Sequence, residues 1–203
     1  MKLDDKDRSI ITFYSQDPTI SQEIIAKRLG LSQPSVAMRI ARLKQMGALE
    51  IQYGINPLKL GLYLAKVDVS STEPEHILEM FRECPYFANG FTVSGKSNLC
   101  LLFYSESVAT LEAIVNGHLR SNPSVRDVDF NIIITSERKL IFPTMLMTEI
   151  SDTPPCGIKM ECKECSSFKS QKCMGCPATG NYQGKFYYPR ASQVSSFTER
   201  RKK

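Results

Sequence analysis

The sequence lacks any run of about 18 apolar residues, so no part of it is long enough to span a membrane as a helix. Its first eight residues, MKLDDKDR, are too highly charged for a secretory signal peptide. The composition, 42% hydrophobic and 23% charged over 203 residues, is that of a globular protein with one or two domains. These observations predict a folded protein of the cytoplasm.

Signs of catalysis are few as well. We find no nucleophile–base motif, phosphate-binding loop or paired carboxylates in a recognisable context. The two histidines, His76 and His118, fall in segments with helical patterns, where they are expected to be exposed or hydrogen-bonded in a core. The sequence therefore predicts that the protein is not an enzyme.

The segment from residue 19 to residue 47 has the pattern of a helix-turn-helix. An amphipathic run follows the capping-box spacing of TISQ and ends at Gly30. Ser32 can cap a second helix, with Pro34 in its first turn and Gly47 as its left-handed stop. A short turn with a glycine between two helices is the geometry that the motif requires.

The second helix of this motif carries two different faces. Val36, Ile40 and Leu43 recur at helical spacing and would face a core. The opposite face is polar and basic, as expected of a helix that enters the DNA major groove. The candidate DNA-binding residues are Gln33, Ser35, Met38, Arg39, Arg42 and Lys44.

Charge distribution favours DNA over the alternative, an ordinary helical hairpin with solvated arginines. Residues 20–47 contain five basic side chains and one acidic side chain, whereas residues 61–150 contain seven basic and eleven acidic ones. A localised basic patch is typical of nucleic-acid binding. A helix over 4–15 would complete a three-helix unit, and residues 48–53 are expected to leave it as a short strand.

The middle of the chain alternates strand and helix patterns in the order βαββαβ. This order predicts a ferredoxin-like antiparallel sheet with two helices on one face. We expect the other face to be apolar and to be covered by a second copy of the chain. The predicted strands are 63–70, 88–93, 99–104 and 125–134, and the predicted helices are 75–83 and 108–119.

Over residues 2–145 the chain resembles the Lrp/AsnC family of prokaryotic transcription regulators. The resemblance implies a winged or plain helix-turn-helix, a βαββαβ ligand-sensing domain, and dimers that often assemble into octamers. It implies double-stranded DNA and a small-molecule effector as partners. The matching pieces are Leu3-Asp4, Asp7-Arg8, Ile25-Ala26, Leu29-Gly30-Leu31-Ser32, Arg39-Ile40, Leu43, Gly47, Ile55-Asn56-Pro57, Leu60-Gly61 and Val93-Ser94-Gly95.

The chain differs from that family in the turn near which effector amino acids bind. The family usually has Gly-x-x-Asp there, and the resemblance makes Gly95, Lys96 and Asn98 the corresponding candidates. Asn98 lacks the negative charge that an ammonium group needs, and Lys96 would repel one. We therefore expect an effector other than a free amino acid. The alternative is a plain hairpin turn with Gly95 at a positive φ.

Beyond residue 150 the sequence is rich in cysteine. Two CxxC pairs follow a single upstream cysteine, and such pairs aim their thiolates at one point, as zinc and iron–sulfur sites require. Zinc and a 4Fe-4S cluster both remain candidates. The segment CMGCPA, with Tyr182 and Gly184 after it, is similar to the end of SPASM domains, which hold 4Fe-4S clusters. The candidate ligands are Cys156, Cys162, Cys165, Cys173 and Cys176.

The sequence thus predicts an α+β chain with four parts. They are a helix-turn-helix domain (1–55), a ferredoxin-like sensing and dimerisation domain (56–150), a cysteine-rich metal-binding module (151–190) and a basic tail (191–203). The expected function is DNA-binding transcription regulation with metal or redox sensing. Two alternatives stay open: a metal or redox partner protein without specific DNA binding, and a tetrapyrrole-processing enzyme of Lrp-like architecture.

Overall fold

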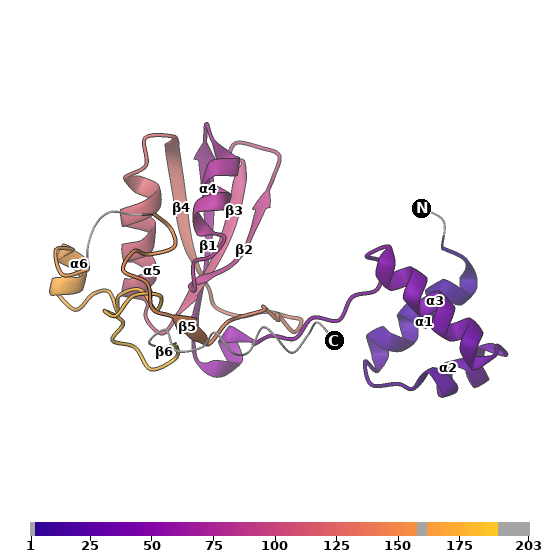
Figure 1. Cartoon of the computed structure of the whole chain (residues 1–203). Helices are drawn as coiled ribbons and strands as arrows, with labels where there is room; N and C mark the ends of the chain where they lie inside the picture. Colours follow the sequence, from indigo (N-terminus) through magenta and orange to yellow (C-terminus); the bar gives the residue numbers. More distant parts are fainter. Residues whose placement is uncertain (1–2, 158–161, 191–203) are drawn as a thin grey trace. The chain divides into compact units, whose positions relative to one another are not determined.

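A computed structural model describes residues 3–157 and 162–190, and the chain divides into two units (Figure 1). The amino-terminal unit is Met1–Gln52 and the carboxy-terminal unit is Tyr53–Lys203. Among the described residues, no helix is both long and apolar enough to cross a membrane. The predicted basic tail, 191–203, lies outside the described residues.

The amino-terminal unit consists of three helices, as predicted: α1 (Asp5–Gln16), α2 (Gln22–Leu29) and α3 (Gln33–Gln45). Ser21 and Ser32 cap α2 and α3, because each side chain accepts a hydrogen bond from a backbone N–H three residues ahead. The turn between these two helices passes through Gly30 at φ +62°. Buried aliphatic residues from all three helices and from the segments beside them form the core: Ile10, Ile20, Ile25, Ala26, Val36, Ile40, Leu43 and Leu49.

The strand predicted at residues 48–53 is wrong. These residues form no strand, and the side chains of Ile51 and Tyr53 are exposed. The described part of the amino-terminal unit contains no other strand with which this segment could pair, and an extended segment without a partner gains no ladder of hydrogen bonds. The helix-turn-helix is therefore of the plain kind, with no wing among the residues described.

The carboxy-terminal unit has the predicted βαββαβ order. Its sheet is antiparallel with strand order β2-β3-β1-β4, and a short 3₁₀ turn, η1 (Pro57–Leu60), precedes it. The second helix changes from α to π geometry along its length. The elements are β1 (Tyr63–Ser71), α4 (Pro74–Phe81), β2 (Phe87–Thr92), β3 (Leu99–Ser105), α5 (Val108–Ile114), the π-helical η2 (Val115–Arg120) and β4 (Val125–Ile133).

Helices α4 and α5 cover the same face of this sheet (Figure 1). Alternate residues of β1 and β3, such as Val67 and Leu101, point toward the helices and are fully buried. Phe81 of α4 packs edge-on against Phe103 of β3, with ring centroids 4.9 Å apart. Burial of this aliphatic and aromatic layer stabilises the unit and holds both helices against the sheet.

The prediction of an apolar second face is only partly right, because Leu102 and Cys100 of β3 share that face with charged residues of β1. Lys66 and Asp68 of β1 point to that face and form an ion pair, and their strand partners on β4 are Asn131 and Asp129. The hydrogen bond from Lys66 to Asp68 raises the pKa of Lys66. Because this face combines apolar side chains of β3 with charged and amide groups of β1 and β4, burial alone does not require that it be covered.

The segment after β4 returns to the sheet and packs against it. β5 (Met147–Glu149) pairs in parallel with β6 (Tyr188–Arg190), and α6 (Ser166–Lys169) lies between them in the chain. Tyr187 is buried and packs edge-on against Tyr86, with centroids 5.5 Å apart. The cysteine-rich segment therefore belongs to the same compact unit as the sheet.

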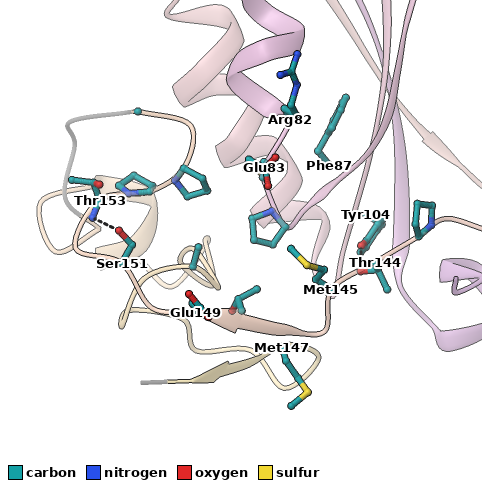
Figure 2. Close-up of a pocket in the computed structure, with 18 residues that line it drawn as sticks. Arg82, Glu83, Phe87, Tyr104, Thr144, Met145, Met147, Glu149, Ser151 and Thr153 are labelled. Carbon is teal, nitrogen blue, oxygen red and sulfur yellow. Dashed lines mark hydrogen bonds between the residues drawn. The ribbon is translucent and has the colours of Figure 1, made fainter. Parts of the chain in front are cut away.

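A groove of about 950 Å³ runs between the carboxyl end of α4 and residues 143–155 (Figure 2). Its wall is mixed, with the charged side chains of Arg82, Glu83 and Glu149 beside Met145 and Met147. The groove also touches Cys84 and Pro154, which line a second and smaller cavity.

Candidate functional site

The outward face of α3 presents part of the predicted DNA-binding set. The side chains of Gln33 and Lys44 are exposed, and Met38 is 72% exposed. Ser35 is half-buried, and its hydroxyl lies 2.8 Å from the hydroxyl of Ser32 at the start of the helix. The amino-terminal half of α3 therefore offers an amide, a hydroxyl and a thioether to a partner.

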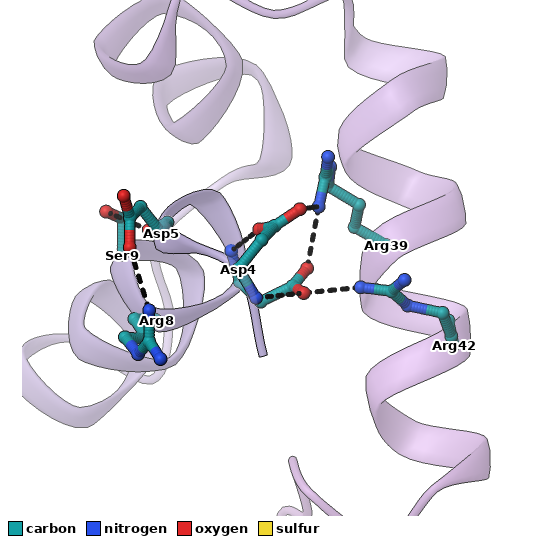
Figure 3. A network of polar contacts seen from close by, with 7 residues as sticks. Asp4, Asp5, Arg8, Ser9, Arg39 and Arg42 are labelled. Carbon is teal, nitrogen blue, oxygen red and sulfur yellow. Dashed lines mark hydrogen bonds and ion pairs between the residues drawn. The ribbon is translucent and has the colours of Figure 1, made fainter. Parts of the chain in front are cut away.

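The two arginines of the predicted set bind carboxylates of α1 (Figure 3). Arg39 Nη1 donates to Asp4 Oδ2 at 2.7 Å and to Asp7 Oδ1 at 2.8 Å. Arg42 Nη2 donates to the other carboxylate oxygen of Asp7. The residue Asp7 is 0% exposed, so a buried carboxylate ties α1 to α3 through both arginines.

This network changes the electrostatics of the candidate interface. The backbone N–H of Asp7, and then the Arg39 guanidinium, lower the pKa of Asp4, and the two carboxylates raise the pKa of Arg39. The charges of the two arginines and the two aspartates cancel, so the candidate interface is less positive than the count over residues 20–47 indicates. A direct role of Arg39 and Arg42 in DNA binding stays a prediction.

The remaining cations of the motif lie on α2 and at the end of α3. Arg28 lies over the ring of Phe13, 5.3 Å from its centroid. Lys27 and Lys44 are exposed in the last turns of their helices. These side chains can neutralise phosphates without giving up an ion pair.

The candidate effector turn lies between β2 and β3. Gly95 has φ +130°, and the exposed Lys96 lies 3.5 Å from Asp127. The side chain of Asn98 binds the end of β1 twice: it accepts from Ser71 N at 2.9 Å and donates to Ser71 O at 2.7 Å. Asn98 therefore joins two strands, while Lys96 is the exposed polar side chain at the turn.

All five cysteines of the predicted metal site line one cavity of about 120 Å³. Two residues of the sheet domain join them there: Cys84, which follows α4, and His118, which lies on η2. None of the seven cysteines forms a disulfide. Among the described residues, no group of three or more histidine, cysteine or carboxylate side chains is arranged to hold a single metal ion.

His118 presents its lone pair to this cavity. Its Nδ1 lies 2.9 Å from the carbonyl oxygen of Ile114, which can only accept, so Nδ1 carries the hydrogen. Burial lowers the pKa of His118, although the bond to Ile114 opposes this effect, and the ring is held neutral. Nε2 then faces Cys156 Sγ at 3.2 Å.

The second CxxC pair is fixed to the sheet domain by hydrogen bonds. Buried Tyr86 donates its hydroxyl to the carbonyl of Gly175 at 2.6 Å, and Met174 N donates to Thr110 Oγ1 at 3.1 Å. Gly175 has φ +78°, and a Cβ there would lie 2.4 Å from the carbonyl oxygen of Asn181. This turn therefore requires glycine.

Burial favours the protonated form of three of the cavity thiols. It raises the pKa of Cys84 and Cys173, and that of Cys176 to about 12. The nearby backbone N–H groups oppose this rise in pKa: that of Gly175 acts on Cys173, and that of Ala178 acts on Cys176. The sulfurs thus have hydrogen-bond donors in place but no positive charge, and a bound cation would invert their pKa shifts.

Sequence reasoning did not include Cys84 or His118 in the site. His118 was expected to be exposed or hydrogen-bonded in a core, and the structure gives it two polar contacts, whereas His76 is exposed. Neither Cys84 nor His118 belongs to a short motif with the other cysteines. The order of the elements alone does not reveal that the ends of two helices meet the distant CxxC pairs.

Comparison with known proteins identifies the amino-terminal unit. Residues 3–44 match the AsnC-type helix-turn-helix domain. The transcriptional regulator AzlB of Bacillus subtilis is 24% identical over 146 residues, which cover 68% of this chain and 93% of AzlB. The HTH-type transcriptional regulator LrpA of Pyrococcus horikoshii is 26% identical over 136 residues, which cover 65% of this chain and 96% of LrpA.

Solved structures give the same fold. E. coli AsnC has a TM-score of 0.60 at 14% identity, covering 68% of this chain and 96% of AsnC. B. subtilis LrpC has a TM-score of 0.58 at 22% identity, covering 69% of this chain and all of LrpC. These relatives match over nearly their whole length, yet they leave close to a third of this chain without a counterpart. The SPASM-like similarity of the cysteine segment stays a prediction.

The first prediction concerns the buried carboxylate of α1. Asp7→Asn should lower the free energy of unfolding of the amino-terminal unit by about 1–3 kcal/mol, because both arginines lose a charged acceptor. Amide hydrogen exchange of peptides from α1 and α3 in the full-length protein measures this. Asp5→Asn is the matched control, since the Asp5 side chain is 98% exposed. Equal exchange in the two variants would contradict the role given to Asp7.

The second prediction concerns the turn of the second CxxC pair. Gly175→Ala should destabilise it by more than about 1 kcal/mol, since alanine strains a positive φ and its Cβ meets Asn181. Alkylation of Cys173 and Cys176, followed by mass spectrometry, should become faster. Gly180→Ala is the control, because a Cβ there has no neighbour within 4 Å. Unchanged alkylation in Gly175→Ala would show that the turn tolerates a side chain.

Proposed function

We propose that this chain, which carries an AsnC-type helix-turn-helix domain, is a DNA-binding transcriptional regulator of the Lrp/AsnC type. The observation that carries the proposal is the match of residues 3–44 to that domain, on a unit whose α3 presents Gln33, Ser35 and Met38 outward. Relatives that match over nearly their whole length are named as transcriptional regulators. These names also support the view that the protein is not an enzyme and acts in the cytoplasm, where its DNA partner lies.

In this proposal the amino-terminal half of α3 enters the major groove. Gln33 has the amide that reads adenine, and Met38 offers an apolar surface to the methyl group of thymine. Lys27 and Lys44 contact phosphates. Asp7 holds Arg39 and Arg42 against α1, so the network fixes the position of α3 relative to α1. Arg39 and Arg42 can add phosphate contacts only if DNA competes with these carboxylates.

The carboxy-terminal unit is the proposed site of assembly and sensing. A helix-turn-helix regulator reads two half-sites when two copies pair, so we propose at least a homodimer, with an octamer as its further assembly. The effector-binding candidates remain Gly95, Lys96 and Asn98, and the groove beside α4 is a further place for a small molecule. The cysteine cavity is the proposed input for metal or redox state, with zinc and a 4Fe-4S cluster as candidates.

DNA binding is the direct test of this proposal. Full-length protein should enrich a specific sequence from random double-stranded DNA, and the logarithm of its affinity should fall linearly with the logarithm of salt concentration. A metal or redox partner protein of the same fold would enrich no sequence. Failure to enrich a sequence at low salt would overturn the proposed function.

The third prediction tests the recognition helix. Met38→Ala should weaken binding to the enriched sequence by about 1–3 kcal/mol, roughly 5- to 150-fold, because a contact to one base pair is lost. Binding to unrelated DNA should not change, since that binding depends on phosphates. Met46→Ala, the same substitution at the C-cap of α3, should bind as the unaltered protein does. Equal losses in both variants would show that Met38 does not read a base.

The fourth prediction concerns assembly. Light scattering of the full-length protein should give at least twice the chain mass of 22.9 kDa at concentrations that saturate the enriched DNA. The reason is the pairing of half-sites, because the helix-free face of the sheet is only partly apolar. A monomeric mass under those conditions would exclude the paired mode of DNA binding.

A further inference from the structure

Two distant parts of the chain enclose the cysteine cavity. Cys84 and His118 come from the helix ends of the sheet domain, and the other thiols come from the segment that begins near Pro154. Tyr86 and Thr110 hold the second CxxC pair against that domain by hydrogen bonds. The cavity is thus a junction between the sheet domain and the cysteine-rich segment.

The side chains around the cavity are of the types that bind a soft metal. Six thiols and one neutral imidazole surround the cavity, and none of the thiols is used in a disulfide. Thiolate and imidazole ligands are those that zinc and iron–sulfur clusters take. The backbone N–H groups of Gly175 and Ala178 lower the pKa of Cys173 and Cys176, and N–H groups near a thiolate are a feature that tunes a cluster.

The size of the cavity favours several metal atoms over one. A structural zinc site takes four ligands at about 2.0–2.3 Å and closes around the ion. This cavity has a volume of about 120 Å³, whereas a water molecule occupies about 30 Å³ in the liquid. One tetrahedral ion takes four ligands, so six thiols are more than it needs. An iron–sulfur cluster takes four thiolates and fills a larger space, which this cavity provides.

His118 has the geometry of a group that acts on a metal centre. Its Nδ1–H is fixed by the carbonyl of Ile114, which orients Nε2 toward Cys156. Imidazoles beside metal sites have this arrangement, in which one nitrogen binds a carbonyl and the other faces the metal or its ligand. The residue lies on the π-helical η2, a rare geometry that is frequent at functional sites.

We propose that an iron–sulfur cluster occupies this cavity, with Cys162, Cys165, Cys173 and Cys176 as its thiolate ligands and with Cys84, Cys156 and His118 facing it. The sheet domain thereby contributes to the metal centre, which links the cysteine segment to the helices of the sensing fold. This inference deepens the proposed metal or redox input, so it rests on that part of the proposed function. Its test uses no DNA, so the two proposals fail separately.

The experiment uses full-length protein purified without oxygen. Iron and sulfide should be present in equal amounts, with a visible absorption that disappears in air and an electron paramagnetic resonance spectrum in the reduced protein. Protein that carries one zinc per chain and no sulfide would overturn the proposal. Protein that carries neither metal, with the segment still folded, would overturn it as well.

Variants then test the part played by the sheet domain. Cys84→Ser and His118→Gln should each change the resonance spectrum and lose iron to a chelator about ten- to a hundredfold faster. Cys100→Ser is the matched control, because Cys100 lies on β3 and does not line the cavity. Spectra and iron loss like those of the control in both variants would confine the cluster to the cysteine segment and overturn the proposal. Should Cys84→Ser fail to fold, His118→Gln decides alone.

Discussion

The carboxy-terminal unit depends on the burial of one apolar layer between the sheet and its two helices. Phe81 is fully buried between Phe103 and His118, with ring centroids 4.9 Å and 5.6 Å away. That packing fixes the end of α4 next to the end of α5, which brings Cys84 close to His118. Hydrophobic packing therefore sets the position of the cysteine cavity, and the cysteine-rich segment packs on a surface that the sheet and its helices form.

The sequence predicted the regular elements well where their pattern is local. Helix α2 has the predicted bounds, and the four strands of the sheet lie within a few residues of the predicted ranges, because capping residues and period-2 alternation depend on near neighbours. The strand at 48–53 failed because a strand also needs a partner, which this segment lacks. The polar groups of the second sheet face were readable from Lys66, Asp68 and Asp129, which follow the same alternation.

Long-range contacts explain what the sequence could not reveal. Counting charges over residues 20–47 gave a strongly basic motif, but the carboxylates that bind Arg39 and Arg42 come from α1, outside that window. In the same way the five clustered cysteines were visible as a motif, whereas Cys84 and His118 join them only through the packing of the sheet. A charge or a thiol acquires its function from neighbours in space, and neighbours in sequence give only part of that set.

The parallel pairing of β5 with β6 closes the cysteine-rich segment at its base. A chain held at both ends has already lost much of its conformational entropy, so its thiols stay at a high effective concentration around their cavity. Small zinc modules without such closure are unfolded when they lose their metal. The pairing of β5 with β6 and the packing of Tyr187 on Tyr86 hold this segment without any part played by the thiols, so an occupant of the proposed site would bind between parts of the chain that the fold already holds together.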